Sequence, residues 1–237
     1  MKKPAYKRIL LKLSGEILAG NKGYGIDPNV LSDICNKIIK LKESGIQIGI
    51  VIGGGNIFRG ISAAARGMDR VAGDYLGMMA TIMNSVGLQS GLEELKCDTR
   101  VMSALSITQL AEPYIRRRAT RHLEKNRIVI MAGGTGNPYF TTDTAAVLRA
   151  IEINADVVIK ATKVDGIYSE DPILNPEAVK YPEITFKEVI DKELRVMDMT
   201  AVTLCKENNL PIIVFNINKD ENIIDLINAK HVGTMVS

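Results

Sequence analysis

Residues 127–144 combine glycines with small polar residues in a pattern that could bind phosphate. They read R-I-V-I-M-A-G-G-T-G-N-P-Y-F-T-T-D-T, an apolar run typical of a buried strand followed by glycines. Thr141, Thr142 and Asp143 are then good N-caps for the apolar helix pattern of residues 145–151. A glycine loop before a helix exposes backbone N–H groups where the helix dipole favours an anion. On the glycines alone, an ordinary connection between strand and helix is the better interpretation.

Two more glycine groups follow apolar runs, and each has a cation close by. Residues 53–55 are three glycines that end a β-branched run, and Arg59 follows one short loop later, an arrangement that permits close backbone approach and charge pairing. Lys12 closes the first apolar run beside Ser14 and Gly15, where its ammonium could meet a phosphate as a compact charge. From the local sequence, a surface lysine that closes a strand is an equally good interpretation of Lys12.

Residues 160–171 are a fourth candidate, suited to a nucleotide rather than to phosphate alone. The run Val-Asp-Gly-Ile-Tyr at 164–168 is typical of a hairpin, because Asp-Gly between apolar flanks suits a tight turn. The lysines of this segment, with Tyr168 and Asp171, could hold a base and a ribose. A plain surface hairpin is an equal alternative.

A long helix pattern begins at Asp74, which we expect to be its N-cap, although a carboxylate there could also accept hydrogen bonds from sugar hydroxyls. The apolar residues of this helix form a Met-rich stripe. A ligand surface is one interpretation of the stripe, but core packing or a subunit contact is the better one. The residues predicted to face inward are Tyr75, Met78, Met79, Ile82, Met83, Val86, Leu92 and Leu95.

The elements that must position these loops alternate between strand and helix along the whole chain. This alternation predicts an α/β protein with a mostly parallel sheet covered on both faces, and no linker divides the 237 residues into domains. In such a sheet, ligands bind outside the carboxyl ends of the strands, so the four loops can converge on one crevice that takes two phosphorylated ligands. We expect strands at 8–13, 46–52, 98–103, 127–132, 156–161, 211–215 and 233–236, and helices that begin near 27, 74, 113, 142, 183, 198 and 221.

Composition excludes several classes of function. The net charge is only +3, so nucleic acid is not expected as a main partner, and the basic run from Arg116 to Arg121 lacks stacking aromatics and is best interpreted as a solvated helix face. The three cysteines are far apart and no apolar run approaches a membrane span, so we expect reduced thiols in a cytoplasmic protein without a membrane partner. Neither His122 nor His231 has a partner at metal-ligand spacing, and no residues are predicted to bind a metal directly.

Several known nucleotide motifs are missing from the sequence, whereas four others are present. The chain has no G-x-x-x-x-G-K-[ST], no protein-kinase signature set and no G-x-G-x-x-G opening a helix. It does contain K-L-S-G-E (12–16), V-I-G-G-G-N-I-F-R-G (51–60), G-T-G-N-P-Y-F-T-T-D-T-A-A (134–146) and K-A-T-K-V-D-G-I-Y (160–168). Together these motifs closely resemble the bacterial uridylate (UMP) kinases of the amino-acid kinase superfamily, over essentially the whole chain. The third motif is specific to the uridylate branch.

This resemblance implies a three-layer αβα sandwich that assembles as a homohexamer and uses Mg²⁺ to transfer the γ-phosphate of ATP to UMP. It also implies one domain, with the acceptor bound by roughly residues 1–150 and ATP by roughly 151–237. The catalytic residues would be Lys12, Arg59 and Asp143. ATP would contact Lys12, Ser14, Gly15, Gly55, Arg59, Thr162, Tyr168 and Asp171. UMP would contact Gly54, Asp74, Thr135, Gly136, Asn137, Pro138, Tyr139, Phe140, Thr141 and Thr142.

The resemblance further implies regulation by nucleotides. GTP would activate through the loop of Gly20, Asn21, Lys22, Gly23, Tyr24 and Gly25, and UTP would inhibit. Because an acceptor phosphate is already ionised, no strong general base is required, and we expect Asp143 to hold lysines, namely Lys12 and Lys160, rather than to act as a base. Two alternatives stay open: an acetylglutamate, aspartate or carbamate kinase of the same superfamily, and a uridine-nucleotide sensor without catalysis.

Overall fold

The computed structural model describes residues 4, 6–59, 67–172, 174–194, 196–228 and 230–237. Over this part of the chain, nine strands form one sheet, and all neighbouring pairs are parallel except β10 with β11. The strands, in their order across the sheet, are β4 (Glu112–Pro113), β3 (Thr99–Ser103), β5 (Ile128–Ala132), β2 (Gln47–Ile52), β1 (Arg8–Leu13), β6 (Val157–Thr162), β10 (Ile212–Asn216), β11 (Thr234–Val236) and β9 (Glu183–Ile184). The mostly parallel sheet predicted from the sequence is confirmed.

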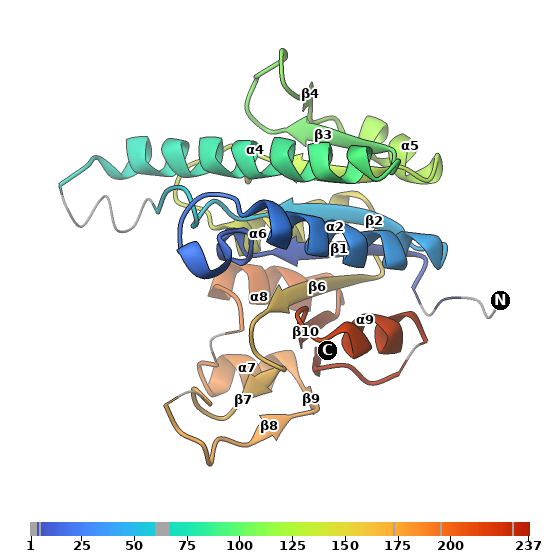
Figure 1. Ribbon diagram of the computed structural model, residues 1–237. Coiled ribbons are helices and arrows are strands. Elements are labelled where there is room, and N and C mark those ends of the chain that lie inside the picture. The colour runs from blue at the N-terminus through green and yellow to red at the C-terminus, as the bar shows by residue number, and fades with distance from the viewer. Residues whose placement is uncertain (1–3, 5, 60–66, 173, 195, 229) are drawn as a thin grey trace.

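Helices cover both faces of this sheet (Figure 1). One hydrophobic cluster packs α2 (Pro28–Glu43), α4 (Arg70–Glu94) and α9 (Asp220–Ile227) against one face. A second cluster packs α5 (Arg116–Glu124), α6 (Thr142–Glu152), α7 (Phe186–Asp191) and α8 (Met199–Glu207) against the other. Strand β1 serves both, since Ile9 and Leu11 belong to the first cluster and Leu10 to the second. The expected α/β fold with three layers is therefore confirmed.

The helix starts follow the caps expected from the sequence in most cases. The carboxylate of Asp27 accepts from the N–H of Asn29 at 2.9 Å, with Pro28 in the first turn of α2. Thr141 caps α6 by accepting from the N–H groups of Asp143 and Thr144. None of the described helices combines the length and hydropathy needed to cross a membrane.

The start of α4 corrects one prediction. Its N-cap is Asp69, whose carboxylate accepts from the N–H of Ala72 at 2.8 Å, so Asp74 lies inside the helix instead of capping it. Both carboxylates precede apolar helix positions, but only Asp74 was expected to be the cap. As an interior residue of α4, Asp74 is not needed as its cap, so the carboxylate of Asp74 is left for other partners.

The faces of α4 also differ from the prediction. Tyr75, Met79 and Met83, expected to face inward, are exposed, with Met79 and Met83 at 51% and 57%. Leu95, just beyond the helix, is exposed as well. The buried face instead includes the polar side chains of Thr81, Asn84 and Ser85, beside Met78, Ile82, Leu88 and Leu92. Apolar residues occur on both sides of this helix, so their spacing alone could not decide which side packs inward.

The expected hairpin at Asp165-Gly166 does not form. Strand β7 (Ile167–Tyr168) pairs antiparallel with β8 (Lys180–Tyr181) and not with β6. The turn is anchored elsewhere, because Asp165 pairs with Lys219 at 2.5 Å and the N–H of Ile167 donates to Thr234 Oγ1 at 2.8 Å. Three short strands, β4, β8 and β9, were not expected. The helix predicted to start near 183 begins at Phe186 behind a capping box of Thr185 and Glu188.

Candidate active site

The loops singled out in the sequence follow neighbouring strands. Strand β1 lies between β2 and β6, and β5 lies on the far side of β2. All four strands are parallel, so the loops after Leu13, Ile52, Ala132 and Thr162 leave the same edge of the sheet. This is the edge where open α/β sheets bind ligands.

Three charged side chains from these segments meet at that edge. Lys12 Nζ lies 2.6 Å from Asp143 Oδ1, and Lys160 Nζ lies 3.0 Å from Asp143 Oδ2. Lys12 and Lys160 stand opposite each other in the register of β1 and β6, and Asp143 lies in the first turn of α6. The pairing of Asp143 with both lysines, expected from the sequence, is therefore present.

Burial and charge oppose each other in this cluster. Burial alone would raise the pKa of Asp143, but the ammonium groups of Lys12 and Lys160 hold it below its usual value. For Lys160, burial is the larger effect and lowers the pKa, although Asp143 acts in the opposite direction. Lys160 also donates to the carbonyl of Val196. Asp143 is therefore an ionised carboxylate, occupied by two cations and unsuited to accept a proton.

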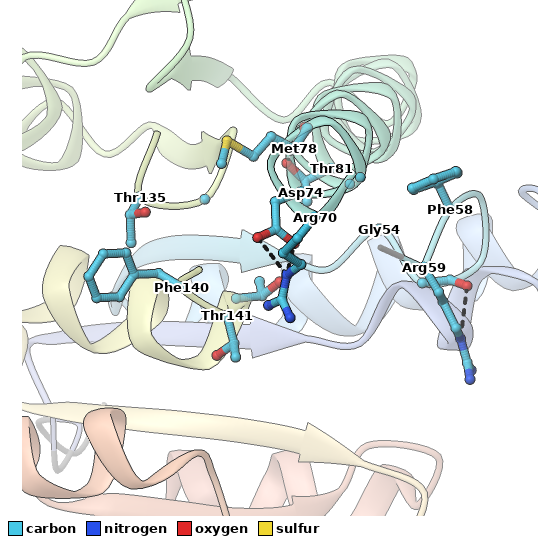
Figure 2. A pocket seen from close by; sticks show the side chains of 15 residues that line it. Gly54, Phe58, Arg59, Arg70, Asp74, Met78, Thr81, Thr135, Phe140 and Thr141 are labelled. Atoms are coloured by element: carbon cyan, nitrogen blue, oxygen red, sulfur yellow. Dashed lines mark hydrogen bonds and ion pairs between the residues drawn. The ribbon is translucent and has the colours of Figure 1, made fainter. Parts of the chain in front are cut away.

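A pocket of about 400 Å³ opens beside this cluster. Figure 2 shows Arg70 and Asp74 reaching down from α4, with Thr135 and Phe140 at one end and Phe58 and Arg59 at the other. The predicted acceptor residues that line the pocket are Gly54, Asp74, Thr135, Phe140, Thr141 and Thr142. Gly136, Asn137, Pro138 and Tyr139 are not among its lining residues, whereas Gly55 and Arg59, expected to contact ATP, are.

Arg70 is a pocket residue that the sequence interpretation missed. Its Nε donates to both oxygens of Asp74, at 3.0 and 2.9 Å, and its guanidinium lies 5.6 Å from the ring centroid of Tyr139. Asp74 also accepts from the N–H of Tyr139 at 2.8 Å. Arg70 lies one helical turn before Asp74, and that spacing is the signal that could have revealed it. The other lining residues not predicted are Phe58, Gly73, Gly77, Met78, Thr81 and Gly134.

The loop between β5 and α6 is held in place by α4. Thr81 Oγ1 accepts from the N–H of Gly133 at 2.8 Å, and the Asp74 contact fixes the N–H of Tyr139. Gly133, Gly134 and Gly136 have φ between 60° and 82°, a region that costs other residues strain. Tyr139 has the same left-handed backbone conformation, with φ at 72°, although it is not a glycine. The glycines of this loop are thus required by its backbone conformation.

Arg59 lies at the open end of the pocket. Its guanidinium forms an ion pair with Glu16, and both side chains are largely exposed, at 57% and 47%. An exposed pair of this kind contributes about 0–1 kcal/mol. An incoming phosphate can therefore replace Glu16 as the partner of Arg59 at little cost.

The other residues expected to contact ATP lie just after β1, at the end of β6 and in the segment that follows it. Ser14 precedes α1 (Gly15–Leu18), and Gly15 packs directly against the carbonyl of Gly53. The hydroxyl of Thr162 bonds with the backbone of Val164. Tyr168 lies in β7, and the carbonyl of Asp171 accepts from Leu174 and Asn175 in the loop that follows.

The loop expected to respond to GTP contacts the glycine loop that follows β2. Gly20–Lys22 forms the short helix η1, and Gly23 follows at φ 70°. The N–H of Gly25 donates to the carbonyl of Asn56 at 2.9 Å, and Asn56 Nδ2 donates to the carbonyl of Gly25 at 2.7 Å. A two-bond clamp thus joins this loop to the segment that follows Gly55.

Two remaining features have structural explanations. The arginines of α5 are exposed while Ala119 and Leu123 are buried, in agreement with a solvated face. No group of three or more His, Cys, Asp or Glu side chains that could hold a metal ion occurs among the described residues. Both carboxylate oxygens of Asp143 face lysines in this structure.

Comparison with known proteins agrees with this fold. Residues 7–216 match the amino acid kinase family, and the chain belongs to that family. Within it, the structure is similar to the UMP kinase of Bacillus anthracis, with a TM-score of 0.95 and 41% identity over 98% of this chain and 96% of that one. The UMP kinase of Ureaplasma parvum matches with a TM-score of 0.92 and 39% identity over 100% of both chains. The uridylate kinase of Archaeoglobus fulgidus matches with a TM-score of 0.73 and 28% identity over 97% and 99%. The resemblance expected from the four motifs is confirmed.

Proposed function

We propose that this chain is a UMP kinase, a nucleoside monophosphate kinase that reversibly transfers the γ-phosphate of ATP to UMP and yields ADP and UDP. The observation that carries the proposal is the position of the pocket. Thr142 lines it and directly precedes Asp143, so a ligand phosphate there lies next to the cluster of Lys12, Asp143 and Lys160. Solved structures of UMP kinases share the fold over essentially the whole chain.

The acceptor occupies the pocket between α4 and the loop of residues 133–142. The carboxylate of Asp74 suits the hydroxyls of a ribose, because it accepts hydrogen bonds and is fixed by Arg70. The backbone at Gly54 and the side chain of Arg59 suit the 5′-phosphate. Thr135, Phe140 and Thr141 lie at the other end of the pocket, where the base belongs.

ATP enters from the side of β1 and β6, where Ser14, Gly15, Thr162, Tyr168 and Asp171 follow the strands. In this arrangement roughly residues 1–150 bind the acceptor and roughly 151–237 bind ATP, within one domain. Gly55 and Arg59 stand in the acceptor pocket, and we assign Arg59 to the meeting point of the two phosphates.

Catalysis then depends on alignment and on cancellation of charge. Phosphoryl transfer requires little covalent assistance, and the acceptor phosphate needs no strong base. Lys12 and Lys160 supply positive charge at the edge of the sheet, and Asp143 fixes both ammonium groups. Mg²⁺ accompanies the ATP phosphates, whose charge it neutralises, and needs no protein cage.

The finer parts of the proposal come from the resemblance. The enzyme is a cytoplasmic homohexamer that carries out the first committed phosphorylation on the route to UTP and CTP. GTP activates it through residues 20–25, and UTP inhibits it. The clamp between Gly25 and Asn56 supports activation by GTP, because it connects residues 20–25 to the glycine loop after β2, whose Gly54 and Gly55 line the pocket.

An acceptor screen with purified protein, ATP and Mg²⁺ tests the assignment. We expect ADP release that depends on UMP, with UDP as the product, and no product from acetylglutamate, aspartate or carbamate. Phosphorylation of one of those three acceptors would show that the protein is a different kinase of the amino acid kinase family. Tight binding of UTP without formation of UDP would make the protein a nucleotide sensor.

A further inference from the structure

Two buried asparagines beneath the glycine loop 53–55 form a closed hydrogen-bond network. Asn84 of α4 is 0% exposed and Asn56 is 1% exposed. Asn84 Nδ2 donates to Asn56 Oδ1 at 2.7 Å, and Asn56 Nδ2 donates to Asn84 Oδ1 at 3.0 Å. The remaining N–H of each amide donates to a backbone carbonyl, Asn84 to Gly53 and Asn56 to Gly25, both at 2.7 Å.

This network fixes the orientation of both amides. Each amide nitrogen has two N–H groups, and all four of them are used. If the amide of Asn84 rotated by 180°, its oxygen would face the carbonyl oxygen of Gly53. The same rotation of Asn56 would place its oxygen against the carbonyl oxygen of Gly25. In either case two acceptors would face each other in a buried site. The pair therefore holds the Gly53 carbonyl in one direction only.

The carbonyl of the next residue is held as well. The carbonyl of Gly54 accepts from the N–H groups of Ile57 and Phe58, both at 2.9 Å, within the turn that follows. In a planar trans peptide, the C=O of one residue and the N–H of the next point in opposite directions. The N–H of Gly54 therefore points away from the carbonyl of Gly53, and the N–H of Gly55 points away from the carbonyl of Gly54. Gly54 and Gly55 both line the pocket.

We propose that Asn84 is a positioning residue for the acceptor phosphate: it anchors the Gly53 carbonyl and so keeps the N–H of Gly54 directed into the pocket. The Gly54 carbonyl is held by backbone groups of its own turn, whereas the Gly53 carbonyl depends on a side chain from α4. Without this anchor, the Gly53–Gly54 peptide can rotate and present a carbonyl oxygen to the phosphate, replacing attraction by repulsion. The inference rests on the proposed function, since it takes the ligand of Gly54 to be a phosphate of UMP.

The test is equilibrium binding of UMP and of ATP to the Asn84→Asp variant, measured by titration calorimetry. This change keeps the volume of the side chain but replaces the Nδ2 donor with an acceptor. We expect UMP affinity to fall about 10- to 100-fold, the value of a hydrogen bond to a charged group, while ATP affinity changes less than twofold. The matched control is Ser85→Ala, which removes an equally buried hydroxyl of α4 that bonds only the carbonyl of Thr81 in its own helix.

The outcomes separate the two claims. If wild-type protein binds no UMP, the proposed function fails and this inference fails with it. If wild-type protein binds UMP and the folded Asn84→Asp variant binds it within twofold of wild type, or loses both ligands equally, only the positioning role is overturned. If the variant does not fold, a crystal structure of the wild-type protein with UMP tests the positioning role of Asn84 instead. A phosphate oxygen within hydrogen-bond distance of the Gly54 nitrogen supports the proposal, and a Gly53 carbonyl that has left Asn84 overturns it.

Discussion

Asp143 is the residue whose chemistry depends most on its neighbours. It is mostly buried, and each of its oxygens faces an ammonium group, of Lys12 or of Lys160. Removal of either lysine would leave the carboxylate partly uncompensated, whereas removal of Asp143 would leave two buried cations facing each other. The cluster therefore contributes to stability as well as to catalysis.

The lowered pKa of Asp143 predicts a defined pH dependence of stability. A carboxyl group whose pKa is lower in the folded state stabilises the fold above its unfolded pKa of about 4, and this contribution is lost as the pH falls through the folded value. We expect the difference in free energy of unfolding between wild type and Asp143→Asn to be constant near pH 7 and to shrink below about pH 4. Urea titrations of both proteins across this range measure it. A difference independent of pH would contradict an ionised, paired Asp143.

Thr142 lines the acceptor pocket and begins α6. Thr142→Ala should raise KM for UMP more than KM for ATP, by several-fold, because loss of one hydrogen bond costs roughly 1 kcal/mol. Steady-state kinetics with each substrate varied in turn provide the comparison. Thr203→Ala, at an exposed position of α8, is the control and should change neither value. Equal increases in KM for UMP and in KM for ATP would show that Thr142 does not contact the acceptor specifically.

At the scale of elements, the first turn after β1 is packed against the glycine loop after β2. A Cβ atom at Gly15 would lie 2.3 Å from the carbonyl oxygen of Gly53 and 2.5 Å from Asn56 Oδ1. Gly77, inside α4, has no atom outside its own helix segment within 4 Å of the same point. Close backbone approach therefore requires glycine at Gly15, whereas the space beside the Cα of Gly77 would accept a methyl group.

Alanine at these positions should have opposite effects on stability. Gly15→Ala should destabilise the fold by about 1–3 kcal/mol, since backbone atoms of the glycine loop must move. Gly77→Ala should stabilise it by about 0.5–1 kcal/mol, because alanine loses less conformational entropy in a helix. Urea unfolding of the two variants gives both values. Equal stabilities of Gly15→Ala and wild type would show that the two loops are not packed as described.

Most elements could be predicted from sequence, because the apolar spacing and the caps of each one are local. The central strands are apolar on both faces, and Asp27, Thr141 and Asp198 cap the helices that follow them. The faces of α4 could not be predicted, since Thr81 and Asn84 are buried by bonds to the backbone of distant loops. Such partners leave no periodic signal.

The candidate site was predicted in part for the same reason. Glycine loops with nearby cations indicated phosphate chemistry without deciding it, and the roles of Lys12, Gly54 and Asp143 came from the resemblance to the uridylate kinases. Arg70 was missed because its role depends on Asp74 one turn away and on the ring of Tyr139, which is brought close only by the fold. The hairpin at 164–168 failed because contacts with Lys219 and Thr234 fix that turn.

At the scale of the whole molecule, the exposed apolar side chains of α4 fit an assembly. Met79 and Met83 are exposed side chains of α4. This helix covers one face of the sheet (Figure 1). In the proposed hexamer these side chains would be covered by another subunit. Sedimentation equilibrium should give six times the chain mass of 25.9 kDa for wild type. The double variant Met79→Glu/Met83→Glu should give smaller species, and an unchanged hexamer would place the subunit contact elsewhere.

The turnover of Lys12→Ala at saturating ATP and UMP tests the central claim most directly, because Lys12 is proposed to supply positive charge that stabilises the transferring phosphate. Wild type should convert UMP to UDP. In the variant the activation barrier should rise by roughly two to four kcal/mol, which lowers kcat about 30- to 1,000-fold. Lys206→Ala, at an exposed lysine of α8, is the matched control and should turn over normally. Near-normal formation of UDP by Lys12→Ala would contradict the account.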